Sequence, residues 1–288
     1  MSVPPHLTQS DLTVGRSDGR SPGILYGTAW KKLQTTALVA KAIDLGFRGI
    51  DTACQPKHYD EAAVGAGVAV CIDAGVVTRN DLYLQTKFTP LSGQDPSRIP
   101  YDPGAPVADQ VAQSFRVSLQ NLRTTYLDCL VLHSPLADAR QTDDAWQAME
   151  TIVDASGSKH IGISNCYSAG YLQTLYRRAR VKPAVVQNRF YAQTNYDREI
   201  RVFCRQHGIT YQSFWTLTAN AQILSHDTTV SLASKYARTP AQILFRYLTH
   251  VGVVPLTGTT SELHMRQDLQ IFDFNLTERE QASFGALL

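Results

Sequence analysis

The chain has 288 residues, 43% of them hydrophobic and 18% charged, with a formal net charge of +2. This length suits one (β/α)8 barrel, and so weak a positive charge gives no reason to expect nucleic acid or a membrane surface as a partner. The N-terminus lacks the apolar core of a signal peptide, and no run of about 18 apolar residues exists to span a membrane. We therefore expect a soluble, cytoplasmic protein. Five scattered cysteines without a C-x-x-C pair predict free thiols rather than disulfides or a metal site.

Short apolar runs rich in β-branched residues recur along the whole chain and predict eight β-strands. They span residues 23–30, 47–53, 81–88, 128–134, 159–165, 184–190, 209–215 and 251–258. Stretches of helical periodicity lie between them, at 35–46 with Gly46 as C-cap, 105–124, 143–156, and 239–250 with Thr239 as N-cap and Pro240 in the first turn. Alternating strands and helices favour parallel β-α units, and eight such units close a barrel.

We therefore predict a single-domain (β/α)8 barrel over residues 1–288. A doubly wound sheet is the main alternative, but no G-x-G-x-x-G motif opens any of the predicted helices. The turn-rich stretch at 13–23 predicts a short hairpin across the bottom of the barrel. No internal repeat and no linker-like composition divides the chain.

Polar side chains end most of the predicted strands, and this is the end of an α/β barrel where active sites lie. These ends carry Asp51, Lys87, His133, Ser164 with Asn165, Gln187, Phe214 with Trp215, and Thr257. Each has an ordinary structural explanation when taken alone, such as a buried ion pair or a helix cap. Together they direct carboxylate, ammonium, imidazole and amide groups to one mouth, which favours a catalytic site.

Several segments, in the same order, resemble the aldo-keto reductase family of nicotinamide-dependent (β/α)8 oxidoreductases. They are "GFRGIDTA" (46–53), "LQTKF" (84–88), "YLDCLVLHSP" (126–135), "IGISN" (161–165), "VVQNRFY" (185–191) and "FDF" (272–274) with the "LTE" that follows. The resemblance implies an NADPH-dependent enzyme that reduces an aldehyde or ketone to an alcohol. It assigns catalytic roles to Asp51, Tyr59, Lys87 and His133.

The chemistry explains why these four residue types occur together. A carbonyl that accepts a hydride develops negative charge on its oxygen and needs a proton. The resemblance makes Tyr59 the proton donor, and we expect the Lys87 ammonium to lower the phenol pKa while Asp51 holds that ammonium in place. His133 would orient and polarise the carbonyl. Tyr59 follows Asp51 by eight positions where the family usually has five, so we expect a longer loop that still delivers Tyr59.

The resemblance also places the nicotinamide half of the cofactor. Ser164, Asn165 and Gln187 match the residues that bind the carboxamide, and Phe214 matches the aromatic ring that stacks on the nicotinamide. The remaining expected contacts are Gly27 and Thr28 after the first strand, and Trp215, Thr216 and Leu217 in the loop over the pyrophosphate.

The phosphate end departs from the family pattern. Leu256 stands where many members carry a lysine that contacts the 2′-phosphate of the adenosine. The residues left to bind a phosphate are Gly258, Thr259, Thr260, Ser261 and His264, with Arg266 nearby; alternatively, the hydroxyls simply cap the last helix. NADP(H) is therefore the expected cofactor, and NAD(H) stays possible.

The substrate pocket is predicted less closely. We expect it to be lined by Trp30, His58, His133 and Trp215, with Lys57 on the surface. The chain ends fourteen residues after "FDF", so a truncated C-terminal loop is expected. The connection 88–107, with five prolines and two glycines, would then be the main lid over a wide mouth.

Two other functions stay open at this level. One is a non-catalytic, nicotinamide-sensing regulatory subunit of the same fold, which the complete set of four catalytic residues disfavours. The other is a Schiff-base aldolase that uses Lys87, but this would require a desolvated lysine rather than one paired with Asp51. We expect a monomer that acts on a small carbonyl compound without a metal ion.

Overall fold

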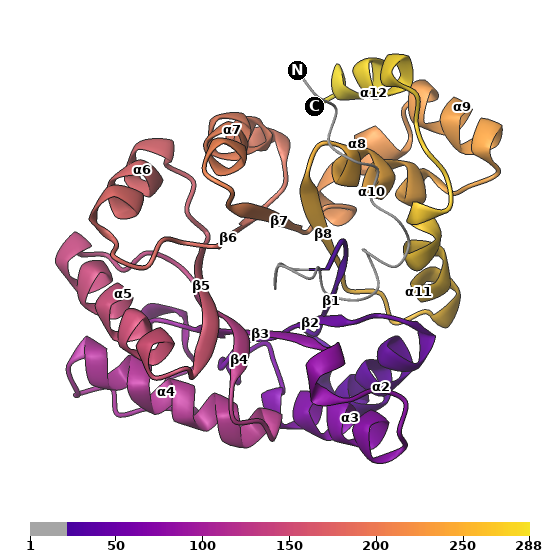
Figure 1. Cartoon of the computed structure of the whole chain (residues 1–288). Coiled ribbons are helices and arrows are strands. Elements are labelled where there is room, and N and C mark those ends of the chain that lie inside the picture. Colours follow the sequence, from indigo (N-terminus) through magenta and orange to yellow (C-terminus); the bar gives the residue numbers. More distant parts are fainter. Residues whose placement is uncertain (1–21) are drawn as a thin grey trace.

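The computed structural model describes residues 22–288, so the hairpin predicted at 13–23 lies almost entirely outside the described residues. Eight parallel strands form a closed barrel in chain order, as predicted (Figure 1). The strands are β1 (Leu25–Gly27), β2 (Gly49–Asp51), β3 (Tyr83–Phe88), β4 (Leu127–Leu132), β5 (Ser158–Ser164), β6 (Val185–Arg189), β7 (Thr210–Phe214) and β8 (Val253–Thr257). Each falls inside one of the eight predicted runs or within a residue of it.

Helices surround the barrel (Figure 1). They are α2 (Thr35–Leu45), α3 (Glu61–Asp73), α4 (Val107–Leu122), α5 (Ala139–Asp154), α6 (Ala169–Arg178), α7 (Arg198–Gln206), α8 (Ala221–Leu224), α9 (Asp227–Tyr236), α10 (Pro240–His250), α11 (Glu262–Leu269) and α12 (Glu278–Gly285). The predicted caps are confirmed: Gly46 ends α2 with φ 119°, and the Thr239 side chain accepts a hydrogen bond from the backbone N–H of Gln242 at the start of α10.

Closure of the barrel brings the first and last strands together. β1 pairs with β2 on one side and with β8 on the other, with Tyr26 opposite Thr257 in the register. The loops that follow β1 and β8 therefore emerge side by side at the carboxyl end of the barrel, although more than 200 residues separate them in the chain.

The alternation of side chains along each strand divides the interior into levels. Leu25, Tyr83, Cys129, Val131 and Val185 form a small apolar cluster of their own. Polar side chains lie further along the same strands. Gln85 and Gln187 follow Tyr83 and Val185 by two residues, and Lys87 and His133 lie nearer the carboxyl ends. The barrel interior therefore has an apolar level, with polar side chains above it toward the carboxyl ends of the strands.

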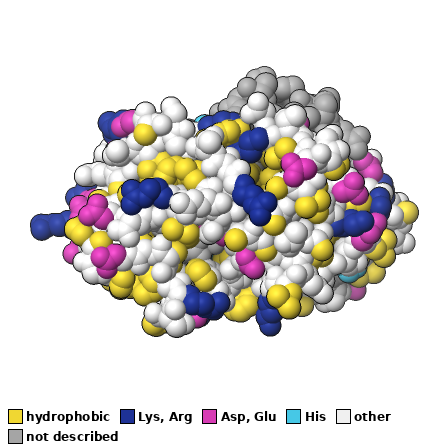
Figure 2. All heavy atoms as spheres, turned by 90° about the horizontal axis from the view of Figure 1, so that it is seen from below, with side chains coloured by type: hydrophobic (Ala, Val, Ile, Leu, Met, Phe, Trp, Pro, Cys, Tyr) yellow, Lys and Arg dark blue, Asp and Glu magenta, His cyan; other side chains and the backbone are white. Residues whose placement is uncertain are grey.

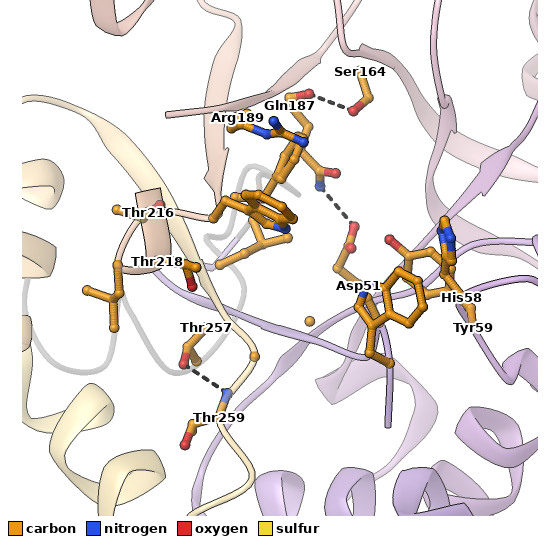
Figure 3. A pocket seen from close by; sticks show the side chains of 18 of the residues that line it. Asp51, His58, Tyr59, Ser164, Gln187, Arg189, Thr216, Thr218, Thr257 and Thr259 are labelled. Atoms are coloured by element: carbon orange, nitrogen blue, oxygen red, sulfur yellow. Dashed lines mark hydrogen bonds between the residues drawn. The ribbon is translucent and has the colours of Figure 1, made fainter. Parts of the chain in front are cut away.

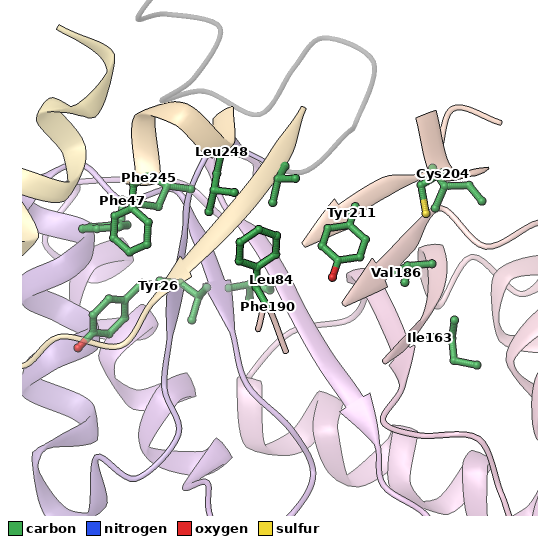
Figure 4. Packing of buried hydrophobic residues seen from close by; sticks show 14 of the residues in the cluster. Tyr26, Phe47, Leu84, Ile163, Val186, Phe190, Cys204, Tyr211, Phe245 and Leu248 are labelled. Carbon is green, nitrogen blue, oxygen red and sulfur yellow. The ribbon is translucent and has the colours of Figure 1, made fainter. Parts of the chain in front are cut away.

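The other face of the strands packs against the helices and forms the main hydrophobic core. Figure 4 shows part of it, where Leu84, Ile163 and Val186 point away from the barrel interior. These residues are at most 1% exposed, as is Phe245 on α10. Because both faces of every strand are covered, the positions of the strand ends are fixed firmly.

Charged residues show no segregation on the face seen in Figure 2, where basic and acidic side chains are interspersed. All five cysteines are free and buried. Within residues 22–288, no helix is long and apolar enough to cross a membrane, and no three His, Cys, Asp or Glu side chains gather as metal ligands would.

Candidate functional site

A pocket of about 880 Å³ opens at the carboxyl ends of the strands, and residues at or directly after the ends of all eight strands line it. That volume lies in the upper part of the range of about 300–1,000 Å³ for small-molecule sites. Figure 3 shows side chains from β2, β5, β6 and the loops after β7 and β8 around one space. The pocket is where barrel enzymes keep their active sites.

Asp51 and Lys87 form a buried ion pair beneath the pocket. Lys87 Nζ lies 2.8 and 2.7 Å from the two carboxylate oxygens of Asp51 and donates a third hydrogen bond, of 2.8 Å, to the carbonyl oxygen of Thr52. The two residues are 2% and 1% exposed. All three ammonium hydrogens therefore have acceptors, and the lysine is held in one position.

Two glutamines complete the surroundings of the Asp51 carboxylate. Gln85 and Gln187 donate to Asp51 Oδ1 at 2.7 and 2.9 Å, and both also donate to Gln212 Oε1. Gln212 returns a bond to Gln85 Oε1 at 3.0 Å. Side chains of β3 and β6 therefore bind the carboxylate directly, and Gln212 on β7 links the two glutamines. Of the three glutamines, only Gln187 was predicted from the sequence.

Tyr59 reaches the pocket in spite of the longer loop. Its ring centroid lies 5.4 Å from Lys87 Nζ and 6.2 Å from the centroid of the His133 ring. The loop is held by backbone bonds from Cys54 N to Lys87 O and from Trp30 N to His58 O. Asp51, Tyr59, Lys87 and His133 thus come together, as the spacing argument expected.

The pKa of Tyr59 differs from the expectation. Burial, and then the negative charge of Asp51, raise the pKa of this phenol well above its usual value of 10. The reason is that the Lys87 ammonium is already neutralised by the carboxylate beside it. Tyr59 is therefore a fully protonated phenol at neutral pH.

His133 is neutral and its ring is anchored. Burial, and then the positive charge of Lys87, lower the pKa of the imidazole well below 6.5. Its Nδ1 lies 2.6 Å from Thr89 Oγ1. A Thr89 hydroxyl that donates its hydrogen to Nδ1 leaves the hydrogen of the neutral ring on Nε2, and one that accepts from Nδ1 leaves Nε2 without a hydrogen.

The three residues expected to bind a carboxamide lie together at the ends of β5 and β6. The Ser164 hydroxyl donates to the carbonyl oxygen of Gln187 at 2.6 Å, and Asn165 Nδ2 donates to the carbonyl oxygen of His133 at 2.8 Å. Asn165 has a left-handed backbone conformation with φ 52°, which turns its side chain toward the strand 4 end. All three line the pocket, and Figure 3 shows Ser164 and Gln187 there.

The loop after β7 forms another wall. Phe214, Trp215, Thr216 and Leu217 all line the pocket. Trp215 is 51% exposed and has φ 56°, whereas Thr216 is buried and donates from its hydroxyl to Ser213 Oγ at 2.9 Å. Thr216 therefore anchors this loop to β7, while the exposed indole of Trp215 lies at the mouth of the pocket.

Only some of the expected phosphate-binding residues line the pocket. Gly258, Thr259 and His264 line the pocket, whereas Thr260 and Ser261 do not. The Ser261 hydroxyl accepts from His264 N and caps α11, which is the ordinary structural role left open by the sequence. Arg266, which does not line the pocket, is paired with Glu262 at 2.7 Å.

At the β1 end, Gly27 lines the pocket and Thr28 does not. The Thr28 hydroxyl donates to the carbonyl oxygen of Asp51 at 2.9 Å, so it supports the catalytic strand rather than facing the cavity. Trp30 is 59% exposed and its ring packs on His58 with a centroid distance of 4.0 Å. Of the connection 88–107, only Thr89 and Gly93 line the pocket.

Comparison with known proteins agrees with the geometry. A family model described as the aldo/keto reductase family matches residues 23–288. The chain belongs to this family. Aldo-keto reductase AKR2E4 of Bombyx mori is 31% identical over 262 residues, covering 85% of this chain and 79% of that protein. Glyoxal reductase of Bacillus subtilis (strain 168) is 27% identical over 254 residues, covering 88% and 83%.

Solved structures of aldo-keto reductases also match. The crystal structure of Bombyx mori AKR2E4 in complex with NADP has a TM-score of 0.78 and 26% identity, covering 94% of this chain and 90% of that one. An aldo/keto reductase from Brucella melitensis has a TM-score of 0.77 at 26% identity, covering 94% and 97%. The predicted family, barrel fold and oxidoreductase class are therefore confirmed.

Several polar residues that line the pocket of this aldo-keto reductase were not predicted from the sequence, among them Lys31, Thr89, Arg189 and Asp268. The side chain of Lys31 is 7% exposed, and its Nζ donates to the carbonyl oxygen of Gly258. The pairing of β1 with β8 could have revealed it, because the two loops must be neighbours. Arg189 follows Gln187 by two residues, so strand alternation already placed both on the same face.

Proposed function

We propose that this aldo-keto reductase reduces aldehyde or ketone carbonyls to alcohols with NADPH as its cofactor. The observation that carries the proposal is the arrangement of Tyr59 and neutral His133 above the buried pair of Lys87 and Asp51. A reduced nicotinamide dinucleotide, when bound, supplies the hydride. The chain itself has to position the carbonyl, stabilise its oxygen and provide a proton.

Tyr59 holds the proton at its phenolic oxygen. Its raised pKa keeps it protonated at any pH near neutral. An alkoxide is a stronger base than a phenolate, so proton transfer from the phenol to the reduced oxygen runs downhill even without a lowered pKa. The Lys87 ammonium, 5.4 Å from the ring centroid, then stabilises the phenolate that remains.

His133 orients the carbonyl. In this proposal the Thr89 hydroxyl donates to Nδ1, so the neutral ring donates to the carbonyl from Nε2. A neutral donor polarises the carbonyl without competing with Tyr59 as the acid, which separates the two roles. This division follows the general pattern in which adjacent groups are given different protonation states by their surroundings.

The residues around the pocket fit a nicotinamide dinucleotide. Asn165 and Gln187 offer amide groups to a carboxamide, and Phe214 offers an aromatic face to the nicotinamide. At the opposite end, the ammonium of Lys31 and the hydroxyl of Thr259 suit a phosphate. The NADP named in the silkworm structure supports NADPH as the cofactor, and the cationic Lys31 suits a phosphate group of either dinucleotide.

Tyr59→Phe tests the proposal. With the purified full chain, cofactor binding is followed by quenching of protein fluorescence, and turnover by absorbance at 340 nm with a panel of aldehydes and ketones. We expect kcat to fall by about 10³-fold, within the range for loss of a general acid, while the Kd for NADPH changes by less than about twofold. Equal loss of binding and turnover would assign Tyr59 a structural role.

Wild-type behaviour separates the remaining functions. Tight NADPH binding with no turnover of any carbonyl compound would favour a nicotinamide-sensing regulatory subunit. Failure to bind either NADPH or NADH would contradict both proposals. Borohydride trapping of a carbonyl substrate on Lys87 would indicate the aldolase instead, although its pairing with Asp51 at 2.7 Å argues against a free amine.

A further inference from the structure

The side chain of Arg189 lines the pocket without an oxygen partner among residues 22–288. It ends β6, and Figure 3 shows it beside Gln187 and Ser164 on the same wall. Its guanidinium carbon lies 4.1 Å from the centroid of the Trp215 ring and 5.4 Å from that of Tyr191. Its Nε is buried and makes no hydrogen bond.

Three other half-buried arginines are satisfied by neighbouring oxygens. Arg79 pairs with Asp128 at 2.9 Å. The Nε groups of Arg201 and Arg246 donate to the carbonyl oxygens of Tyr196 and Phe274 at 2.8 and 2.7 Å. These three arginines also lie over aromatic rings, so what distinguishes Arg189 is that its side chain has no oxygen partner among residues 22–288 in addition to its ring contacts.

The carboxylates that line the pocket do not compensate this charge. Asp51 is bound by Lys87 and two glutamines, and Asp268 accepts from the Thr257 hydroxyl at 2.7 Å. A half-buried cation with no anionic partner is unfavourable, since it loses hydration without gaining a counter-charge. A bound anion would restore that balance.

Stacking on Trp215 presents the edge of the guanidinium for recognition. An arginine fork of this kind matches a carboxylate or a phosphoryl group through two parallel N–H···O bonds. The backbone at Trp215 adopts a left-handed conformation that non-glycine residues rarely take, so the surroundings hold the indole there against a local preference. The Arg189 backbone N–H is anchored too, by a 3.2 Å bond to the Tyr167 hydroxyl.

We propose that Arg189, stacked on Trp215, is an anion-binding residue of the pocket and takes an oxyanion carried by a molecule bound there. This inference rests on the proposed carbonyl reductase function and adds to it. Two sources present the same chemistry: the diphosphate of the dinucleotide, and a carboxylate on the carbonyl substrate. In the second case the enzyme prefers aldehydes or ketones that carry an acid group.

The experiment compares the full-length wild type with Arg189→Met, Arg189→Lys and Arg205→Met. Arg205 is an exposed arginine on α7 and controls for the loss of one positive charge. The Kd values for NADPH and NADH are measured by fluorescence, and kcat/KM is measured for 4-formylbenzoate and for its uncharged methyl ester. Calorimetric titration with inorganic pyrophosphate measures oxyanion binding without any turnover.

Each source gives its own result. If the anion is the diphosphate, Arg189→Met weakens NADPH and NADH alike by about tenfold or more and leaves the preference between the two aldehydes unchanged. If it is the substrate carboxylate, the ratio of kcat/KM for 4-formylbenzoate over its ester falls by about tenfold or more, with cofactor affinity unchanged. Arg189→Lys should retain part of either effect, and Arg205→Met should match the wild type.

The inference is overturned if the wild type binds cofactor and reduces both aldehydes while Arg189→Met changes every one of these values by less than twofold. A wild type that reduces neither aldehyde contradicts the proposed function instead. In that case pyrophosphate binding decides the role of Arg189: a loss of tenfold or more in Arg189→Met supports it, and an unchanged or absent affinity in both proteins rejects it.

Discussion

The two ends of the pocket are built in different ways. At the catalytic end, Asp51 and Lys87 are almost fully buried at strand ends and are held by hydrogen bonds from β2, β3, β6 and their loops. At the phosphate end, Lys31 and Thr259 lie on the loops after β1 and β8, and two of the five expected phosphate-binding residues, Thr260 and Ser261, do not line the cavity. Strand register sets the positions of the side chains at the catalytic end, and contacts between loops set those at the phosphate end.

This difference implies unequal sensitivity to substitution. A side chain in a closed hydrogen-bond network cannot be removed without leaving a buried charge or polar group unpaired, which costs free energy of folding as well as activity. Removing a side chain that lies on a loop costs less free energy of folding, and the main effect is on ligand affinity. Substitutions at the two ends should therefore differ in how far they affect stability and how far they affect ligand affinity.

Lys87→Met should have the largest effect. It leaves Asp51 as a buried carboxylate without its cation, and breaking a pair of this kind costs about 3–5 kcal/mol. We expect the free energy of unfolding in urea to fall by about 3 kcal/mol, because Gln85 and Gln187 still donate to the carboxylate. Reduction of carbonyl substrates should be lost at the same time.

Lys159→Met is the matched control for Lys87→Met. Lys159 Nζ also lies 2.8 Å from an aspartate, Asp128, but its side chain is 50% exposed. Solvent screens such a pair, so its loss should cost less than about 1 kcal/mol. Similar losses for the two lysines would show that burial does not distinguish the catalytic end.

Thr89→Val should come next. The change removes the hydroxyl 2.6 Å from His133 Nδ1 with little change in shape. It leaves a buried imidazole nitrogen unpaired and frees the ring to adopt the other tautomer, at a cost of about 1–3 kcal/mol. We expect kcat to fall by about 10- to 100-fold, with the Kd for NADPH unchanged.

Two further measurements distinguish orientation of His133 from simple packing in this case. Nitrogen-15 NMR of the labelled enzyme should show the hydrogen of the His133 ring mainly on Nε2 in the wild type and shared between the two nitrogens in Thr89→Val. Thr89→Ser, which keeps the hydroxyl, should restore most of the rate. Equal rates for the valine and serine variants would rule out an orienting role.

The contrast between the two ends also explains what could be predicted from the sequence. The eight strands, the caps at Gly46 and Thr239, and the meeting of Asp51, Lys87 and His133 follow from local periodicity and from the rule that strand ends share one face. The eight-residue spacing from Asp51 to Tyr59 did not prevent their meeting, because a loop anchored at both ends can accommodate extra residues.

Other features depend on contacts between distant segments. Lys31 reaches Gly258 only because the barrel closes β1 against β8, which no local pattern encodes. The raised pKa of Tyr59 contradicts the expected lowering, because burial and the Asp51 charge outweigh a lysine that is already paired. Thr260 and Ser261 resembled phosphate ligands, but the Ser261 hydroxyl caps α11. Residue type alone does not distinguish a phosphate ligand from a helix cap.

Lys31→Met should reduce cofactor affinity at the phosphate end, and it should cost less stability than Lys87→Met because it leaves a carbonyl oxygen rather than a buried carboxylate without its partner. Loss of a charge-assisted hydrogen bond to a phosphate should raise the Kd for NADPH by about tenfold. Lys32→Met removes the same charge from an exposed neighbouring position and serves as the control. A smaller effect on NADH than on NADPH would place Lys31 at the 2′-phosphate, and equal effects would place it at the diphosphate. If the two variants behave alike, Lys31 does not bind the cofactor.

The smallest expected effect comes from Asp268, which lines the pocket near the Thr257 hydroxyl. Burial raises the pKa of this carboxyl to about 7, from an ordinary value of 3.8. The folded protein therefore favours the protonated form, and stability from this group declines as the pH rises from about 4 to 7. Above pH 7 the carboxylate carries a negative charge on the same pocket as the cofactor phosphates.

We therefore expect the Kd for NADPH to rise by about threefold between pH 6 and pH 8 as Asp268 ionises. Asp268→Asn keeps an acceptor for Thr257 but cannot ionise, so this part of the pH dependence should disappear while affinity at pH 6 stays the same. His264 also lines this end, and the asparagine variant leaves its contribution unchanged, so the difference between the two profiles belongs to Asp268. Identical profiles would mean that the carboxyl lies too far from the phosphates to repel them. Cofactor affinity at the phosphate end would then not depend on the charge of Asp268.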